Sequence, residues 1–159
     1  MKSVVAILLL VLQTVSAHAA TDLSLVSAAK AQDWTAVEAL LKSGSVDFNA
    51  AQPDGATALA WTTYWDNAKT AKRLLRAGAD PNVANDNGVT PLSLACKNRS
   101  LAMVELLLDG EADPEITLWD GVTPLMIAAK SGHIDITRAL IDADADVNVS
   151  EPRRGQNAL

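Results

Sequence analysis

Two side chains in the 159-residue sequence have the chemistry to act as a nucleophile and a general base. Cys96 is the single cysteine, and His133 is the one histidine beyond the first 19 residues. A thiol and an imidazole cooperate only within hydrogen-bond reach, and these two residues belong to different copies of a repeated unit. We therefore expect both to be structural, with Cys96 as a small buried thiol.

A cluster of carboxylates near the end of the sequence resembles the start of a calcium-binding loop. Asp142, Asp144 and Asp146 alternate with alanines. The pattern fails at its sixth position, where Val147 replaces glycine, and at its twelfth, where Arg153 replaces glutamate. We expect a solvated acidic helix end and no metal, with a weak cation site as the alternative. The sequence also lacks a phosphate-binding loop, so we predict a protein that is not an enzyme and needs no cofactor.

The elements that hold these residues repeat along the chain. Gly55, Gly88 and Gly121 open the frames GATAL, GVTPL and GVTPL, and successive glycines are 33 residues apart. A fourth frame, GQNAL, begins at Gly155. A fixed period of this length indicates stacked supersecondary units.

Apolar residues predict two helices in each unit. Pairs of apolar residues four positions apart mark one face of the second helix in each unit. The leucine of each frame lies at the start of the first helix. Neither helix is long enough to be stable alone, so each must bury its face against the next unit. The predicted fold is all-α, a solenoid of paired antiparallel helices joined by turns or short hairpins. In the second helix of each unit, the apolar pair further along the sequence is Leu40/Leu41, Leu74/Leu75, Leu107/Leu108 or Leu140/Ile141. The frame leucines are Leu25, Leu59, Leu92 and Leu125.

The residue that ends the second helix differs between units. In AGADPN, Gly78 suits the left-handed backbone conformation that commonly ends a helix. Glu111 and Asp144 occupy the corresponding positions in the next two units, where a positive φ is less favourable. We therefore expect looser helix ends at these two residues.

Two segments resemble the ankyrin repeat: GVTPLSLACKN and GVTPLMIAAKSGHIDITRALIDADADVN. The likeness covers about residues 23–159 and implies an ankyrin-repeat solenoid that binds another protein through its turns and inner helices. The histidine that usually follows the TPL motif is replaced by Ala60, Ser93 and Met126, which implies loss of its hydrogen bond to the threonine. ALAWTTYWDN followed by GVTPLSLACKN is similar to exported bacterial ankyrin-repeat proteins that continue for several more repeats.

The N-terminal residues predict export. Lys2 precedes an apolar stretch from Val4 to Val15, and Ala17-His18-Ala19 supplies the small residues that signal peptidase needs. We expect cleavage after Ala19, with Ala17 as the alternative, and a periplasmic or secreted protein without stable membrane insertion. An uncleaved anchor is disfavoured because the stretch is short for a bilayer. The predicted organisation is a signal peptide over 1–19, a degenerate N-terminal capping repeat over 20–53, repeats over 54–86, 87–119 and 120–153, and the start of a truncated repeat over 154–159.

The charge of the chain bears on its partner. The net charge is −6 at pH 7, which repels phosphate backbones, so no nucleic-acid partner is expected. The predicted partner is another protein, whose identity the sequence does not give. The alternatives are the recognition segment of a longer enzyme or toxin, and a secreted effector that acts on host proteins.

Aromatic residues indicate where the partner binds. Trp34 and Trp61 fall at positions that face the helix packing, so we expect them in the core. Tyr64 and Trp65 end a first helix and Trp119 lies on a turn, and aromatic side chains dominate interface energetics when a partner covers them. Packing of Tyr64 and Trp65 against the adjacent repeat is the alternative. The hypothesised partner-binding residues are Asp54, Trp65, Asp86, Asn87, Lys97, Trp119 and Asp120.

Overall fold

The computed structural model describes residues 22–150, 152, 155 and 157–158. The predicted signal peptide, residues 1–19, lies outside the described residues, and so does half of the predicted truncated repeat. The helices of the described part are α2 (Ser24–Lys30), α3 (Trp34–Ser43), α4 (Ala58–Tyr64), α5 (Ala68–Ala77), α6 (Pro91–Asn98), α7 (Leu101–Asp109), α8 (Pro124–Lys130) and α9 (Ile134–Asp142).

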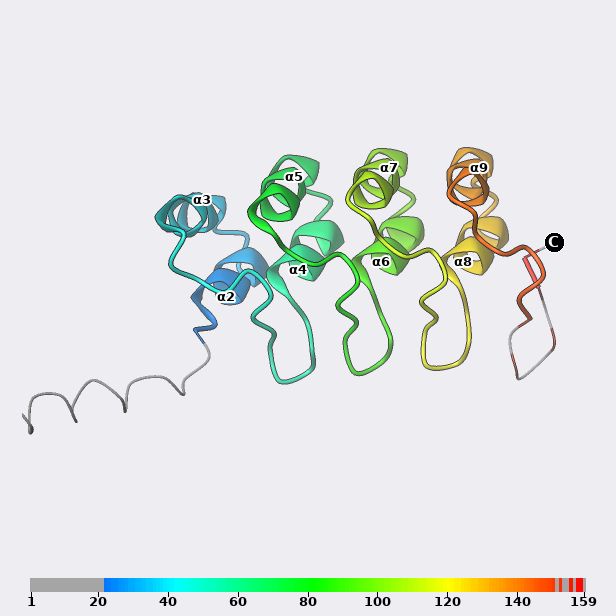
Figure 1. Ribbon diagram of the computed structural model, residues 1–159, viewed down its shortest axis with the longest axis horizontal. Coiled ribbons are helices and arrows are strands. Elements are labelled where there is room, and N and C mark those ends of the chain that lie inside the picture. The colour runs from blue at the N-terminus through cyan, green and yellow to red at the C-terminus, as the bar shows by residue number, and fades with distance from the viewer. Residues whose placement is uncertain (1–21, 151, 153–154, 156, 159) are drawn as a thin grey trace, which may run out of the picture.

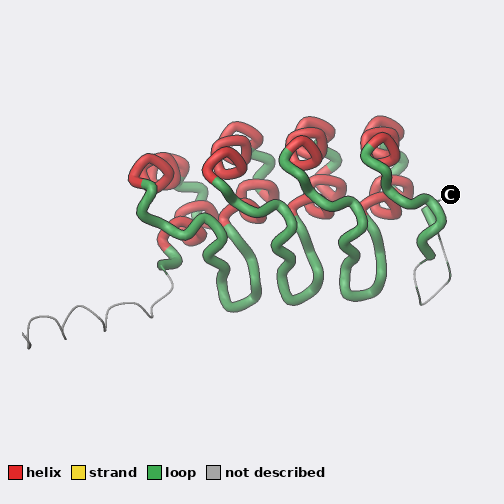
Figure 2. The backbone as a smooth tube through the Cα atoms, in the orientation of Figure 1, coloured by secondary structure: helices red, strands yellow, loops and turns green. Residues whose placement is uncertain are grey.

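The helices form two parallel rows with a third layer of loops. In Figure 1 the first helices of the pairs, α2, α4, α6 and α8, lie in one row, and the second helices α3, α5, α7 and α9 lie above them. The loops between the pairs project from the opposite side of the first-helix row (Figure 2). The predicted all-α ankyrin-type solenoid is confirmed.

A threonine caps the N-terminus of each of the first helices α4, α6 and α8. The hydroxyl oxygens of Thr57, Thr90 and Thr123 accept hydrogen bonds of 3.1–3.2 Å from the amides three residues later. The expectation that the missing histidine costs a hydrogen bond to the threonine is wrong in one unit. The Ser93 hydroxyl donates to the Thr90 carbonyl oxygen at 2.8 Å and accepts from the Thr90 amide at 3.1 Å, which closes a capping box.

The second helices α5, α7 and α9 end in the same way. Glu111 and Asp144 adopt φ values of 66° and 63°, the left-handed conformation that Gly78 also has. In all three cases the amide of the next residue donates to the carbonyl five residues back, at 2.9–3.0 Å. The hydrogen bonding therefore does not show the looser ends that the sequence predicted. A Cβ at Gly78 would have no heavy atom within 4 Å, so a side chain at this position meets only open space.

The core runs through the stack between the two helix rows. The frame leucines Leu25, Leu59, Leu92 and Leu125 are at most 1% exposed. In the second helices α5, α7 and α9, the first member of each leucine pair is buried, while the second member is partly exposed. Each pair of helices thus covers an apolar face of the pair before it, and burial between units replaces the stability that short helices lack.

Loop side chains join successive units by hydrogen bonds. The Asn49 side-chain oxygen accepts from the Asp80 amide at 2.7 Å, and Asn82 accepts from the Asp113 amide at the same distance. A Glu115 carboxylate oxygen takes this role toward the next unit, at 2.8 Å from the Asp146 amide. These bonds satisfy backbone groups at the entrance of each loop.

Successive turns approach so closely that the frame position admits no side chain. A Cβ at Gly88 would lie 2.8 Å from the Thr117 carbonyl oxygen and 2.9 Å from the Trp119 amide nitrogen. At Gly55 the corresponding distance is 2.8 Å, to the Cα of Asn85. Both glycines also have positive φ, of 74° and 82°. Only glycine satisfies both conditions, which explains why the frame glycine marks the repeat.

Replacing the frame glycine should weaken the fold more than replacing the helix-end glycine. We expect Gly88→Ala to lower the free energy of unfolding by about 3 kcal/mol or more, because a clash with the next turn adds to the strain of a positive φ. Gly78→Ala meets strain alone and should cost about 1 kcal/mol. Urea denaturation of both variants measures the difference, and equal losses would contradict a steric role for the turn approach.

A buried hydroxyl in α4 offers a second test of the packing. Thr63 is fully buried, and its hydroxyl oxygen has no hydrogen-bond partner within the described part of the chain. Thr63→Val keeps the shape and removes the desolvation cost of the hydroxyl, so we expect a gain of about 1–2 kcal/mol. In the matched control Thr62→Val, the lost hydroxyl donates to the Ala58 carbonyl at 2.6 Å, and about 1 kcal/mol should be lost. A chemical denaturation series in which Thr63→Val destabilises would refute this account.

Candidate functional site

Five of the seven hypothesised partner-binding residues lie on the tips of the turns. They occupy the two positions before each frame glycine: Asp54, then Asp86 and Asn87, then Trp119 and Asp120. Trp119 is 67% exposed, and Asp120 is half-buried. The tips are joined by backbone bonds from the Asp86 amide to the Asp54 carbonyl and from the Trp119 amide to the Asn87 carbonyl, both 3.0 Å. The structure thus brings these five residues into one row, the turn row.

The other two residues, Trp65 and Lys97, lie at the ends of first helices. Trp65 follows the last residue of α4 and is 39% exposed, and the exposed Lys97 lies in the last turn of α6. Tyr64, beside Trp65, is 51% exposed. The Tyr64 and Trp65 rings meet edge to face with centroids 4.8 Å apart, so these side chains pack on one another and keep exposed surface.

Trp61 connects these aromatic residues to the turn before α4. Its indole N–H donates to the Gln52 side-chain oxygen at 3.0 Å, and its ring lies edge to face with Tyr64 at 5.7 Å between centroids. The Lys30 ammonium of α2 is 5.0 Å from the Trp61 ring centroid, a cation–π distance. Trp61, Tyr64 and Trp65 form what we call the aromatic cluster. The expectation of a core position holds in part for Trp61, which is half-buried and packs against the core.

The next repeat holds the backbone beneath the aromatic cluster. The Asn98 side-chain amide of α6 donates to the carbonyl oxygens of Thr63 and Tyr64, at 3.0 and 3.1 Å. These carbonyls belong to the last turn of α4, where helical hydrogen bonding ends. Sequence reasoning missed Asn98, Gln52 and Lys30. The sequence could have indicated these three residues only through their positions relative to Trp61, once neighbouring repeats are superposed.

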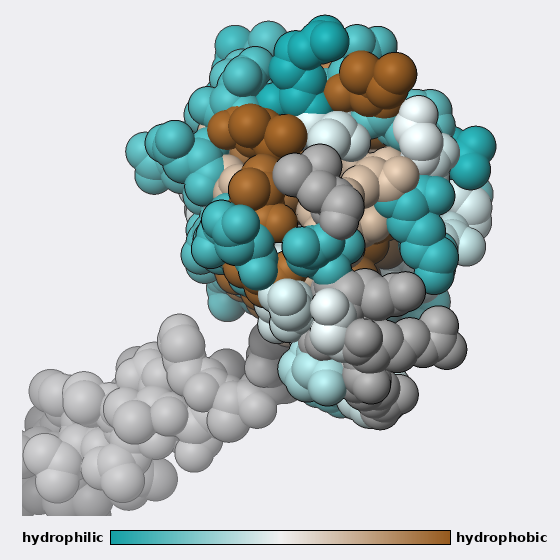
Figure 3. Space-filling model, turned by 90° about the vertical axis from the view of Figure 1, so that its right-hand side faces the viewer, coloured by the Kyte–Doolittle hydropathy of each residue, from teal (hydrophilic) through white to brown (hydrophobic). Residues whose placement is uncertain are grey.

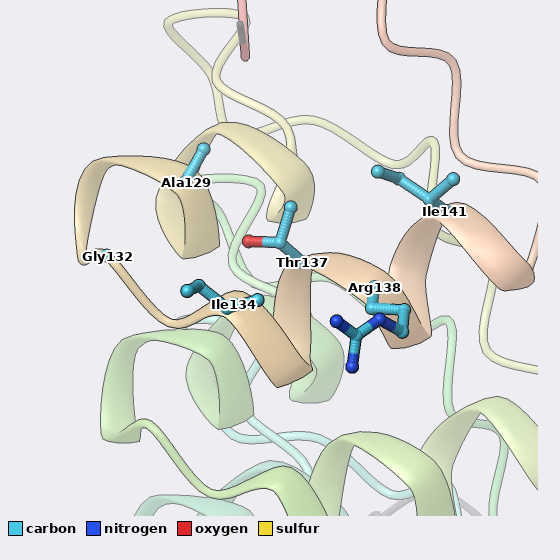
Figure 4. A pocket seen from close by; sticks show the side chains of 6 residues that line it. All are labelled: Ala129, Gly132, Ile134, Thr137, Arg138 and Ile141. Atoms are coloured by element: carbon cyan, nitrogen blue, oxygen red, sulfur yellow. The ribbon is translucent and has the colours of Figure 1, made fainter.

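The end of the stack beyond α9 has an open apolar hollow of about 390 Å³. Figure 3 shows hydrophobic residues on this end, and Figure 4 shows Ile134, Thr137, Arg138 and Ile141 of α9 beside Ala129 of α8. One repeat earlier, the residues equivalent to Ala129 and Thr137 are buried. The hollow therefore lies on the face that joins one helix pair to the next inside the stack, and it has few polar groups to orient a small ligand.

The groups with catalytic potential lie apart from these exposed rows. Cys96 is fully buried in α6, and burial raises the pKa of its thiol from 9.0 to about 12. His133 immediately precedes α9 and is half-buried. Among the described residues, no three His, Cys, Asp or Glu side chains gather as metal ligands. The described helices also include none with the length and apolarity to cross a membrane.

Comparison with known proteins gives one match. The family model for ankyrin repeats, which spans three copies, aligns with residues 25–118 and again with residues 65–151. None of the curated proteins matches the chain. The two alignments together cover α2, except for its first residue, through α9 and the turns between them.

The thiol of Cys96 should be unreactive in the folded protein. At pH 8 we expect a disulfide reagent to label it at least about a hundredfold more slowly in the folded chain than in the urea-unfolded chain, because the thiolate is the reactive form. Equal labelling rates would contradict a buried, protonated thiol.

Between pH 9 and about 12 the folded state keeps a proton on the Cys96 thiol that the unfolded state releases, so the free energy of unfolding should fall as pH rises above 9. Cys96→Ala is the control that should remove this contribution.

Proposed function

Because the chain belongs to the ankyrin-repeat family, whose repeats typically mediate binding to other proteins, we propose that it is an exported, non-catalytic module that binds a partner protein. The binding surface in this proposal consists of the turn row together with the first-helix ends that carry Trp65 and Lys97. A stacked array of this kind offers an extended surface that suits a protein better than a small ligand.

The observation that carries the proposal is the exposure of large aromatic side chains on both parts of this surface. Trp119 on the turn row is 67% exposed, and Tyr64 and Trp65 at the end of α4 are 51% and 39% exposed. Tryptophan and tyrosine are enriched among the residues that dominate binding energy. Their edge-to-face packing holds Tyr64 and Trp65 in place before binding, which reduces the entropy lost on association.

Further features support the remaining parts of the proposal. The raised pKa of the Cys96 thiol removes its reactive form at neutral pH, in keeping with a non-catalytic protein. The net charge of −6 opposes binding to nucleic acid. Export is supported by the basic and apolar N-terminal residues with small residues at 17 and 19.

The proposal is tested by recovering a partner from the periplasm with the tagged chain. We expect Trp119→Ala and Trp65→Ala each to lower recovery at least about tenfold, as loss of a binding hot spot does. Lys72→Ala, an exposed residue of the second helix α5, is the control and should leave recovery unchanged. Unchanged recovery with both tryptophan variants would remove this surface from the proposal.

A further inference from the structure

The ends of the first helices form a row of opposite charge to the turn row. Lys30, Tyr64, Lys97 and Lys130 stand at equivalent positions near the C-terminal ends of α2, α4, α6 and α8, and all four are exposed. We call them the helix-end row. The turn row carries no positive charge, and its acidic members are Asp54, Asp86 and Asp120. A partner segment that follows the helix-end row therefore meets cations on both sides of one aromatic site.

The aromatic site in this row is built to receive an apolar side chain. Tyr64 is flanked by Trp61 and Trp65, with ring centroids at 5.7 and 4.8 Å. Trp61 is fixed by its bond to Gln52, and the Asn98 amide holds the Tyr64 carbonyl. Such a rigid and partly exposed cluster gains most from an apolar group that covers its remaining surface.

Within three positions of the row's members the further charged residues are Asp33, Asp66 and Arg99, so two negative charges stand against four positive ones. The Asp33 carboxylate accepts the Ala36 amide at 3.0 Å and so caps α3. Asp66 follows Trp65, and Arg99 occupies the equivalent position one repeat later, so that the two charges offset one another. The ammonium of Lys30 is 3.5 Å from the neutral side-chain oxygen of Gln52, which orients the lysine without cancelling its charge.

The distance between repeats selects a conformation for the bound segment. Packed helices lie about 8–10 Å apart, so neighbouring members of the row are about that far apart. A polyproline II helix has three residues per turn and rises about 3.1 Å per residue, which returns a side chain to the same face every 9 Å or so. In a β-strand, side chains three residues apart point to opposite faces. Polyproline II is thus the extended conformation whose period matches the row.

We propose that the helix-end row binds an acidic polyproline II segment of the partner protein, with a carboxylate, an apolar side chain and two further carboxylates spaced three residues apart. The apolar side chain covers the aromatic cluster, and the carboxylates pair with Lys30, Lys97 and Lys130. This inference rests on the proposed protein-binding function and names the chemistry of the segment that the chain recognises. The acidic turn row repels the same segment and so restricts it to the helix ends.

The probe is the synthetic peptide Glu-Pro-Ser-Leu-Pro-Ser-Glu-Pro-Ser-Glu, tested with its reversed sequence because either chain direction fits the row. Titration of the full chain, followed by tryptophan fluorescence, should give a dissociation constant on the order of 10⁻⁴ M for one direction. Replacing the leucine by serine should weaken binding at least about tenfold. Replacing all three glutamates by lysines should abolish binding, because every ion pair becomes a repulsion.

A charge exchange separates recognition from a general effect on the fold. Lys97→Glu should weaken binding at least about fivefold, and a peptide in which the middle one of the three glutamates, the one that pairs with Lys97 in either chain direction, is replaced by lysine should restore it. Lys72→Glu on α5 makes the same change in net charge away from the row and should leave binding unchanged. Tyr64→Ala should weaken binding of the peptide. When Tyr64→Ala is combined with Lys97→Glu, the lysine-substituted peptide should still bind better than the original one.

No binding of either peptide direction, tighter binding of the lysine-substituted peptide, or equal effects of Lys97→Glu and Lys72→Glu would each overturn the inference. If a periplasmic partner is still recovered in a manner that depends on Trp119 and Trp65, the proposed function stands and only the acidic segment is excluded. If the peptide binds and its lysine-substituted form rescues Lys97→Glu while no partner is recovered, the inference about the acidic segment stands and the proposed partner-binding surface does not.

Discussion

The architecture depends on the near contact between successive turns. The backbone of one turn passes so close to Gly88 that no side chain fits between them, and the same holds at Gly55. Backbone hydrogen bonds from Asp86 to Asp54 and from Trp119 to Asn87 hold the turns at this separation. Because each turn leads directly into a first helix, the separation of the turns also sets the separation of the helices. Residues at equivalent positions therefore fall into straight rows, which a loosely linked array could not maintain.

Much of the fold could be predicted because each unit is a local structure and the period in sequence is also the period in space. The frame glycines located the turns, and the frame leucines, all fully buried, located the core. Hydrogen bonds between units were less accessible. Asn49 and Asn82 look like ordinary loop residues, and their partners Asp80 and Asp113 lie 31 positions further on. Their role is visible only when the units are superposed.

The candidate surface was predicted less completely than the fold. The turn residues and Trp65 were chosen from their register, and Trp61 was assigned to the core because helical periodicity gives the direction of a side chain and not its reach. An indole is long enough to contact the core on one side and Gln52 on the other. The helix ends at Glu111 and Asp144 show a similar limit, because a positive φ is strained for any side chain, while the hydrogen bonds from the Ala112 and Ala145 amides that hold these ends cannot be read from the sequence.

The bonds that Asn49 and Asn82 make to the following unit also constrain how such a gene can change in length. Each side chain completes a loop that belongs to the next unit. An insertion or deletion of part of a unit therefore leaves a backbone amide without its hydrogen-bond acceptor and displaces a frame glycine. Recombination that adds or removes a whole 33-residue unit recreates every bond at the new junction. Surface loops tolerate single-residue insertions better than the helices that they connect. The step from Gly44 to Gly78, one residue longer than that from Gly78 to Glu111, has the form of such an event.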